Sequence, residues 1–118
     1  MKKLSLLILI LFITISCEKD YLIPNKEVPN WLKTEINNEE QIIKDSPQLM
    51  NAYGAWIRFK WQQEYYFEYQ NPLSSSSPRA ISTNRDTLRI YVFNTTTDYY
   101  KEKCCKEFVW KASKYNEP

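Results

Sequence analysis

Hydrophobic and polar positions alternate over two neighbouring stretches of the chain. Every second residue is apolar from Ala55 to Trp61, and again over residues 65–69. Side chains on a β-strand point alternately to opposite faces of the sheet, so this period of two predicts two strands. The short interruption between them predicts that they form an antiparallel hairpin with one hydrophobic and one charged face.

The same pattern predicts the register of the hairpin. Placing Phe59 opposite Phe67 and Arg58 opposite Glu68 keeps apolar side chains on one face and charged side chains on the other. A slip of one residue would place every side chain of one strand opposite the wrong face of the other strand. We therefore predict a three-residue loop at residues 62–64.

The charged face of this hairpin is a candidate binding surface. It would carry aromatic, cationic and acidic side chains side by side, a mixture typical of protein or sugar recognition. Its members are Trp56, Arg58, Lys60, Tyr66 and Glu68. In the alternative interpretation, the C-terminal segment covers the two aromatic residues, and the arginine and glutamate form an ordinary cross-strand pair.

A helix is predicted before the hairpin, over residues 29–44. Pro29 suits the first turn of a helix, and Trp31, Leu32 and Ile36 recur near helical spacing. The residue before Pro47 resists helical geometry, which ends the segment. We expect this helix to lie on the hydrophobic face of the hairpin.

Two further strands are predicted after the hairpin. Alternation over residues 87–93 predicts the third strand, and the β-rich residues 106–111 predict the fourth. Near-helical spacing of apolar residues leaves a helix open within residues 98–112, after a Thr-rich turn at residues 94–98. The predicted fold class is therefore α+β: one N-terminal helix packed on a mainly antiparallel sheet of about four strands, in a single domain over residues 29–118.

Residues 71–86 form a long polar connection. Loops of this length in a compact domain are either functional or mobile in solvent. The functional interpretation makes it a recognition loop, with Arg79 and Arg85 as candidate contacts.

Composition excludes several function classes. The chain of 118 residues has no histidine and one glycine, Gly54. The first absence removes His-based catalytic pairs and imidazole metal ligands, and the second removes glycine-rich phosphate loops. No spacing of carboxylates singles out an acid/base couple, so we expect no catalysis and no metal site.

The N-terminus reads as a secretory signal. Lys2 and Lys3 precede an apolar run of about a dozen residues, which is too short to span a membrane. The run ends in Thr14-Ile15-Ser16-Cys17, which resembles the lipobox of bacterial lipoproteins. That resemblance implies removal of residues 1–16, a covalent lipid on Cys17 as the only cofactor-like group, and a place in the bacterial cell envelope, at the outer membrane. Residues 17–28 would then be the lipidated cysteine and its tether.

The net charge of the chain without its signal segment narrows the classes of expected partner further. Loss of the two signal lysines takes the basic count from 16 to 14, equal to the 14 acidic residues. A neutral domain lacks the basic surface that phosphate backbones require, so we expect no nucleic-acid partner. We expect the domain to attach to the membrane through the lipid on Cys17.

Two adjacent cysteines, Cys104 and Cys105, are the thiols that remain once Cys17 is assigned to the lipid. In an oxidising compartment they favour a disulfide, but neighbouring Cα atoms are closer than a relaxed disulfide allows. An easily reduced eight-membered ring, a crosslink to a second chain and a buried reduced pair all stay open.

These features predict a lipid-anchored binding module whose partner is an envelope protein or a glycan. The domain is loosely similar to small uncharacterised envelope lipoproteins with aromatic strands and a late Cys-Cys pair. The alternatives are an inhibitor or immunity-type lipoprotein that inserts its Ser-rich loop into a hydrolase or toxin, and, third, an enzyme.

Overall fold

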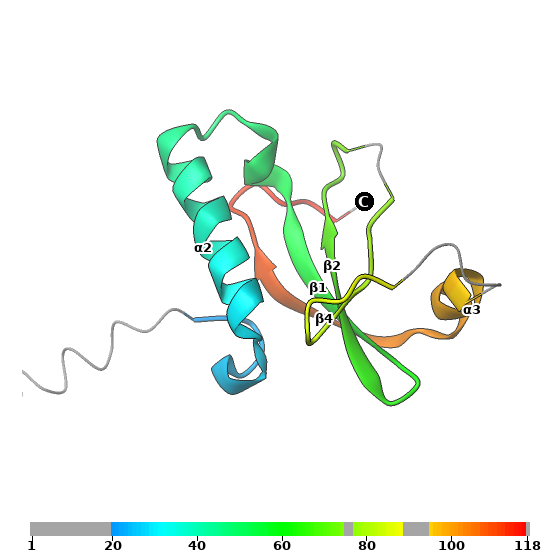
Figure 1. Cartoon of the computed structure of the whole chain (residues 1–118). Helices are drawn as coiled ribbons and strands as arrows, with labels where there is room; N and C mark the ends of the chain where they lie inside the picture. Colours follow the sequence, from blue (N-terminus) through cyan, green and yellow to red (C-terminus); the bar gives the residue numbers. More distant parts are fainter. Residues whose placement is uncertain (1–19, 75–76, 89–94, 118) are drawn as a thin grey trace, which may run out of the picture.

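The fold is a four-stranded antiparallel sheet with a long helix on one face (Figure 1). The computed structural model describes residues 20–74, 77–88 and 95–117. The strands are ordered β3-β2-β1-β4 across the sheet, and the α+β prediction is confirmed. The elements in chain order are η1 (Asn25–Glu27), α2 (Asn30–Asp45), η2 (Met50–Tyr53), β1 (Ala55–Trp61), β2 (Glu64–Gln70), β3 (Ile81–Ser82), α3 (Thr95–Glu102) and β4 (Cys104–Lys111).

Helix α2 lies within one residue of its predicted limits. Pro29 takes the N-cap position, and the helix ends at Asp45, so that Ser46 and Pro47 follow it. Leu32 and Ile36 are fully buried against the sheet. The apolar stripe therefore predicted both the helix and the side of it that packs.

The predicted hairpin register is wrong by one residue. Phe59 pairs with Tyr66 and Arg58 pairs with Phe67. The loop contains two residues, Gln62 and Gln63, with φ angles of 48° and 64°. This is the left-handed geometry of the tight turns that match strand twist, although glycine or asparagine usually occupies it.

The register differs because both faces of the sheet are covered. On one face, Trp31 of α2 contacts Trp56 and Phe67, with ring centroids 6.0 and 5.9 Å away. Aromatic side chains predicted for opposite faces thus share one face beneath the helix. A sheet buried on both sides does not need to separate its apolar residues from the rest.

The opposite face packs against α3. Tyr99 is fully buried there, with its ring centroid 5.5 Å from that of Trp61 and 5.4 Å from that of Tyr66. The predicted Thr-rich turn at residues 94–98 is therefore wrong, because a helix begins at Thr95. The molecule thus has three layers in place of the predicted two.

The outer strands confirm one prediction and correct another. The fourth strand exists and begins two residues earlier than predicted, at Cys104. The short β3 comes from the segment predicted to be wholly loop, residues 71–86, and Ser82 pairs with Tyr66. Most of the predicted strand 87–93 lies outside the described residues, although Thr87 forms an isolated bridge to Ile81.

The described part of the predicted tether packs on the domain. Ile23 and Val28 belong to the core beneath α2, and the amide of Leu22 donates to the carbonyl of Val109, 2.9 Å away. This stretch of the predicted tether is therefore held against the domain. Cys17 and the predicted signal lie outside the described residues, and no helix among those described is long and apolar enough to cross a membrane.

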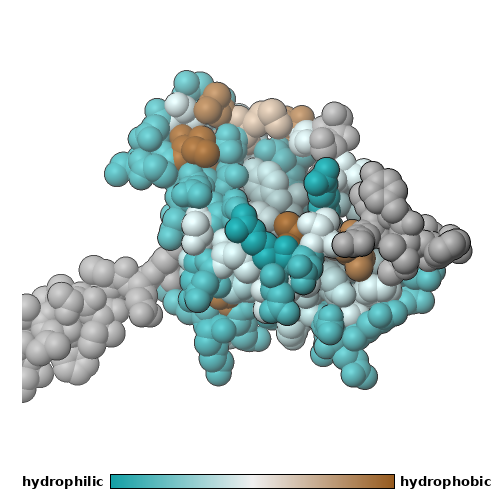
Figure 2. All heavy atoms as spheres, in the orientation of Figure 1, coloured by the Kyte–Doolittle hydropathy of each residue, from teal (hydrophilic) through white to brown (hydrophobic). Residues whose placement is uncertain are grey.

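Exposed hydrophobic side chains gather near one end of α2. Figure 2 shows them over the C-terminal turns of this helix and the η2 region that follows. The exposed large hydrophobic residues here are Ile42, Leu49 and Met50. This end of the molecule also supports the segment that follows β2, because the Asn71 amide donates to the carbonyl of Met50 across 2.9 Å.

Candidate functional site

The five residues of the predicted binding face do not form one surface. Trp56, Arg58 and Lys60 lie on the face that α2 covers, whereas Tyr66 and Glu68 lie on the α3 face. Of the five, only Lys60 is exposed. The prediction of a shared, exposed platform is therefore wrong, and it failed because it depended on the register.

Arg58 has a structural role in this arrangement. Its side chain is 4% exposed and binds Glu107 at 2.8 Å and Glu27 at 3.4 Å. The guanidinium also stacks 4.1 Å above the ring of Tyr65. A buried guanidinium needs such partners, and these tie β1 to β4 and η1. The predicted Arg58–Glu68 pair is wrong.

Glu68 has equally complete partners on the other face. It is 1% exposed, accepts a hydrogen bond from the Tyr99 hydroxyl at 2.5 Å, and binds Lys103 at 2.8 Å. Burial, together with this carboxylate, raises the pKa of Tyr99 well above its usual value. The cluster therefore fastens α3 to the sheet and keeps the tyrosine protonated.

A pocket of about 250 Å³ is lined by residues of β1 and β2 and by residues of the segment between β2 and β3. Trp56 of the predicted binding face and Arg79 of the predicted recognition loop both line this pocket, so it combines residues of two surfaces that the sequence suggested separately. The lining includes Trp56, Tyr69, Asn71, Ser74, Ser77 and Arg79.

Packing holds the aromatic wall of this pocket in place. The ring of Trp56 lies between Trp31 and Tyr69, with centroids 6.0 and 5.5 Å away. Tyr69 in turn lies directly over Gly54, where a Cβ atom would come within 2.1 Å of its hydroxyl oxygen. The only glycine of the chain therefore makes room for a pocket residue.

The hydroxyl group of Tyr69 and the amide of Asn71 complete this side of the wall. Burial raises the pKa of Tyr69, so the hydroxyl group remains neutral. Asn71 donates to it over 3.5 Å. The wall thus combines apolar rings with neutral groups that both donate and accept hydrogen bonds.

Two residues that line this pocket carry donor groups without a partner among the described residues. Arg79 is exposed and forms no ion pair or hydrogen bond with them, whereas Arg85 lies outside the pocket and binds Glu35 at 3.2 Å. Trp56 is 6% exposed, and its indole nitrogen finds no acceptor in the described structure. Buried donors without acceptors are rare and costly, so this sealed indole N–H is an unusual feature of the pocket wall.

Of the residues that line the pocket, the sequence indicates Trp56 and Arg79 as individual candidate contacts. The pattern places Tyr69 on the hydrophobic face of the hairpin, and it includes Asn71, Ser74 and Ser77 only as parts of the candidate recognition loop over residues 71–86. The available signal was an amide- and hydroxyl-rich segment directly after an aromatic strand. Whether these residues meet in one pocket depends on the path of the loop, which periodicity in the sequence does not predict.

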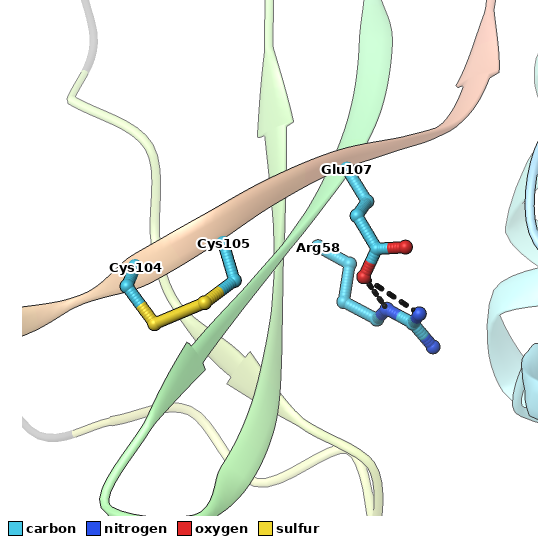
Figure 3. The surroundings of a disulfide bond; sticks show 4 residues. All are labelled: Arg58, Cys104, Cys105 and Glu107. Carbon is cyan, nitrogen blue, oxygen red and sulfur yellow. Dashed lines mark hydrogen bonds and ion pairs between the residues drawn. A yellow bond between two sulfur atoms is a disulfide. The ribbon is translucent and has the colours of Figure 1, made fainter.

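The two adjacent cysteines form a disulfide within the chain (Figure 3). Of the alternatives open from the sequence, the structure has the ring between neighbours. Both side chains are exposed at the start of β4. Within the described ranges, no three side chains of the metal-binding types Cys, Asp and Glu cluster as a metal site would require.

Comparison with known proteins finds no matching family model, no similar curated protein and no similar solved structure. The described residues define a small α+β domain with a polar–aromatic pocket beside Trp56 and an exposed disulfide between adjacent cysteines. Its function is therefore argued from these two sites.

Proposed function

We propose that this protein is a lipid-anchored binding module of the bacterial envelope, and that the Trp56–Arg79 pocket recognises an acidic sugar residue of a glycan. One observation carries the proposal: an aromatic wall and an arginine without an ion pair among the described residues line the same pocket. The membrane attachment rests on the resemblance of residues 14–17 to a lipobox.

The ligand class follows from the chemistry of the lining. Sugar rings carry apolar C–H faces that pack on aromatic side chains, and hydroxyl groups that both donate and accept hydrogen bonds. Tyr69 supplies a ring, and Asn71 and Ser77 supply matching polar groups. The guanidinium of Arg79 suits a carboxylate, because its planar fork can donate two parallel hydrogen bonds.

The geometry supports binding better than inhibition. An inhibitory loop would have to project into its partner, whereas the segment after β2 folds back, pairs through β3 with β2 and forms one wall of the pocket. A concave site accepts a protruding group from its ligand. A sugar residue at the end or side of a glycan chain meets this requirement.

A calorimetric titration of the full chain in detergent micelles tests the proposal. An oligosaccharide that contains hexuronic acid is expected to bind, and its neutral counterpart with the same linkages at least about tenfold more weakly, or about 1.4 kcal/mol. Arg79→Ala should remove this preference. Arg85→Ala is the matched control, because Arg85 lies outside the pocket, and it should leave binding unchanged.

Two outcomes would contradict the proposal. The first is equal affinity for the acidic and neutral oligosaccharides in the unsubstituted protein. The second is an equal loss of binding in the Arg79→Ala and Arg85→Ala variants, which would place recognition outside the pocket.

A further inference from the structure

The disulfide between Cys104 and Cys105 does not crosslink the fold. Its Cα atoms are 3.7 Å apart and belong to neighbouring residues of one strand (Figure 3). A disulfide stabilises a protein mainly by closing a loop in the unfolded chain, and the stabilisation grows with loop length. This bond closes only an eight-membered ring, so the usual structural reason for a disulfide does not apply.

The backbone accommodates the ring as a bulge in β4. Arg58 pairs with Glu107 and Lys60 pairs with Cys104, so β4 uses one residue more than β1 over this interval. Cys105 lies within the interval and has a φ angle of 66°. A non-glycine residue in this left-handed region is strained, and opening the ring releases the constraint that the bond imposes on it.

The two cysteine residues are exposed, whereas the strand beyond them is held by an ion pair. β4 is an edge strand, and both cysteine side chains are exposed. Figure 3 shows the Arg58–Glu107 ion pair further along the same strand, where the buried guanidinium fixes the strand after the bulge. The ring can therefore open without releasing the rest of β4.

We propose that Cys104–Cys105 is a thiol-reactive site that accepts two electrons from a dithiol partner, a reaction separate from glycan binding. A thiolate of the partner attacks one sulfur atom, the Cys104–Cys105 bond breaks, and the other cysteine leaves as a thiolate that takes up a proton. The partner's second thiol then attacks the mixed disulfide. The products are two cysteine thiols in this chain and a disulfide in the partner.

The electrons must come from another molecule. The third cysteine of the sequence is Cys17, to which the lipid is assigned, and the described residues contain no thiol beyond the pair itself. Exposed disulfides under strain are the labile ones, whereas structural disulfides resist reduction by glutathione. The surface position and the bulge at Cys105 place this pair in the labile group.

The experiment uses the full chain with Cys17→Ser, which leaves Cys104 and Cys105 as the only cysteines. Alkylation followed by intact mass counts free thiols after timed exposure to dithiothreitol. The disulfide should be reduced at least about tenfold faster than oxidised glutathione, an unstrained reference, under the same conditions. Excess reduced glutathione should also yield the dithiol form, and oxidised glutathione should restore the disulfide.

Single-cysteine variants trap the intermediate. With Cys17→Ser and Cys105→Ser, the remaining Cys104 should form a mixed disulfide with oxidised glutathione, and a variant without any cysteine should not. Arg79→Ala should exchange at the rate of the unsubstituted pair, which separates this reaction from glycan binding. Resistance of the disulfide to excess glutathione, or two thiols that oxidised glutathione cannot reoxidise, would overturn the proposal.

Discussion

The hydroxyl group of Tyr99 donates a hydrogen bond of 2.5 Å to the carboxylate of Glu68, 31 residues away in the chain. Both side chains are buried, one on α3 and the other on β2. Lys103 binds the same carboxylate oxygen at 2.8 Å. A buried carboxylate would be costly alone, so these two partners explain how an acidic residue occupies the sheet beneath α3.

This relationship predicts loss of stability at alkaline pH. Burial and the Glu68 carboxylate raise the pKa of Tyr99 in the folded state, whereas the unfolded chain releases this proton near pH 10. The folded state then binds more protons, and the free energy of unfolding falls as pH rises above about 10, by up to about 1.4 kcal/mol per pH unit for this residue.

Tyr99→Phe should make that decline shallower. Urea unfolding of both proteins at pH 8 to 11 measures it, and comparison of slopes cancels the constant cost of the lost hydrogen bond. Tyr53→Phe is the control, because Tyr53 lies in η2 and is not one of the described partners of the Glu68 carboxylate. Identical slopes for Tyr99→Phe and the unsubstituted protein would show that Tyr99 ionises freely in the fold.

The hairpin turn should be open to stabilisation. Gln62 and Gln63 both have positive φ angles, a conformation that costs an ordinary residue about 1–2 kcal/mol. Replacing the pair by Asn-Gly should therefore raise the free energy of unfolding by roughly 1–2 kcal/mol, as measured in urea. A neutral or destabilising result would mean that the turn has another geometry, as the three-residue loop would require.

The contact between Gly54 and Tyr69 predicts a substitution that damages the pocket. In Gly54→Ala the new methyl group would overlap the Tyr69 hydroxyl oxygen, so the ring must move. Overpacking of this kind costs roughly 1–3 kcal/mol of stability, and displacement of Tyr69 should also weaken glycan binding. Tyr69→Ala in the same chain should relieve the clash, so the two losses of stability should not add. Additive losses would show that the residues are not in contact.

Comparison of sequence and structure shows which features periodicity can predict. The stripe of Leu32 and Ile36 predicted α2, because a helix that packs on one side needs a single apolar face. The hairpin register could not be predicted in the same way. Aromatic residues cover both faces of β1 and β2, so the rule that separates apolar from polar faces does not choose between registers.

The pocket could not be predicted from the sequence, for a different reason. Arg79 was a candidate, but its meeting with Trp56 depends on the return of the segment after β2, which only pairing through β3 determines. The need for a glycine at position 54 also depends on its contact with Tyr69, 15 residues further along the chain. Helix α3 begins inside the segment predicted as a Thr-rich turn, and the helix left open within residues 98–112 overlaps only its second half.

The lipid anchor remains a prediction from Ser16-Cys17. Cys17→Ser should abolish metabolic labelling with a fatty acid and release the protein from the membrane fraction, because the acylated sulfur is lost. Cys104→Ser serves as the control and should leave both properties unchanged. Retention of the Cys17→Ser protein in the membrane with its label would show that the anchor lies elsewhere.

The pocket can be tested most directly at the indole N–H of Trp56. The protein has four tryptophans, and those at positions 31, 61 and 110 donate to Thr83, Glu102 and Glu40. In a nitrogen-15 NMR titration with the hexuronic acid oligosaccharide, the Trp56 signal, assigned by its loss in Trp56→Phe, should shift and saturate. The signals of Trp61 and Trp110, which lie outside the pocket, should stay in place. A Trp56 signal that stays in place while the oligosaccharide binds would contradict the assignment of this pocket as the recognition site.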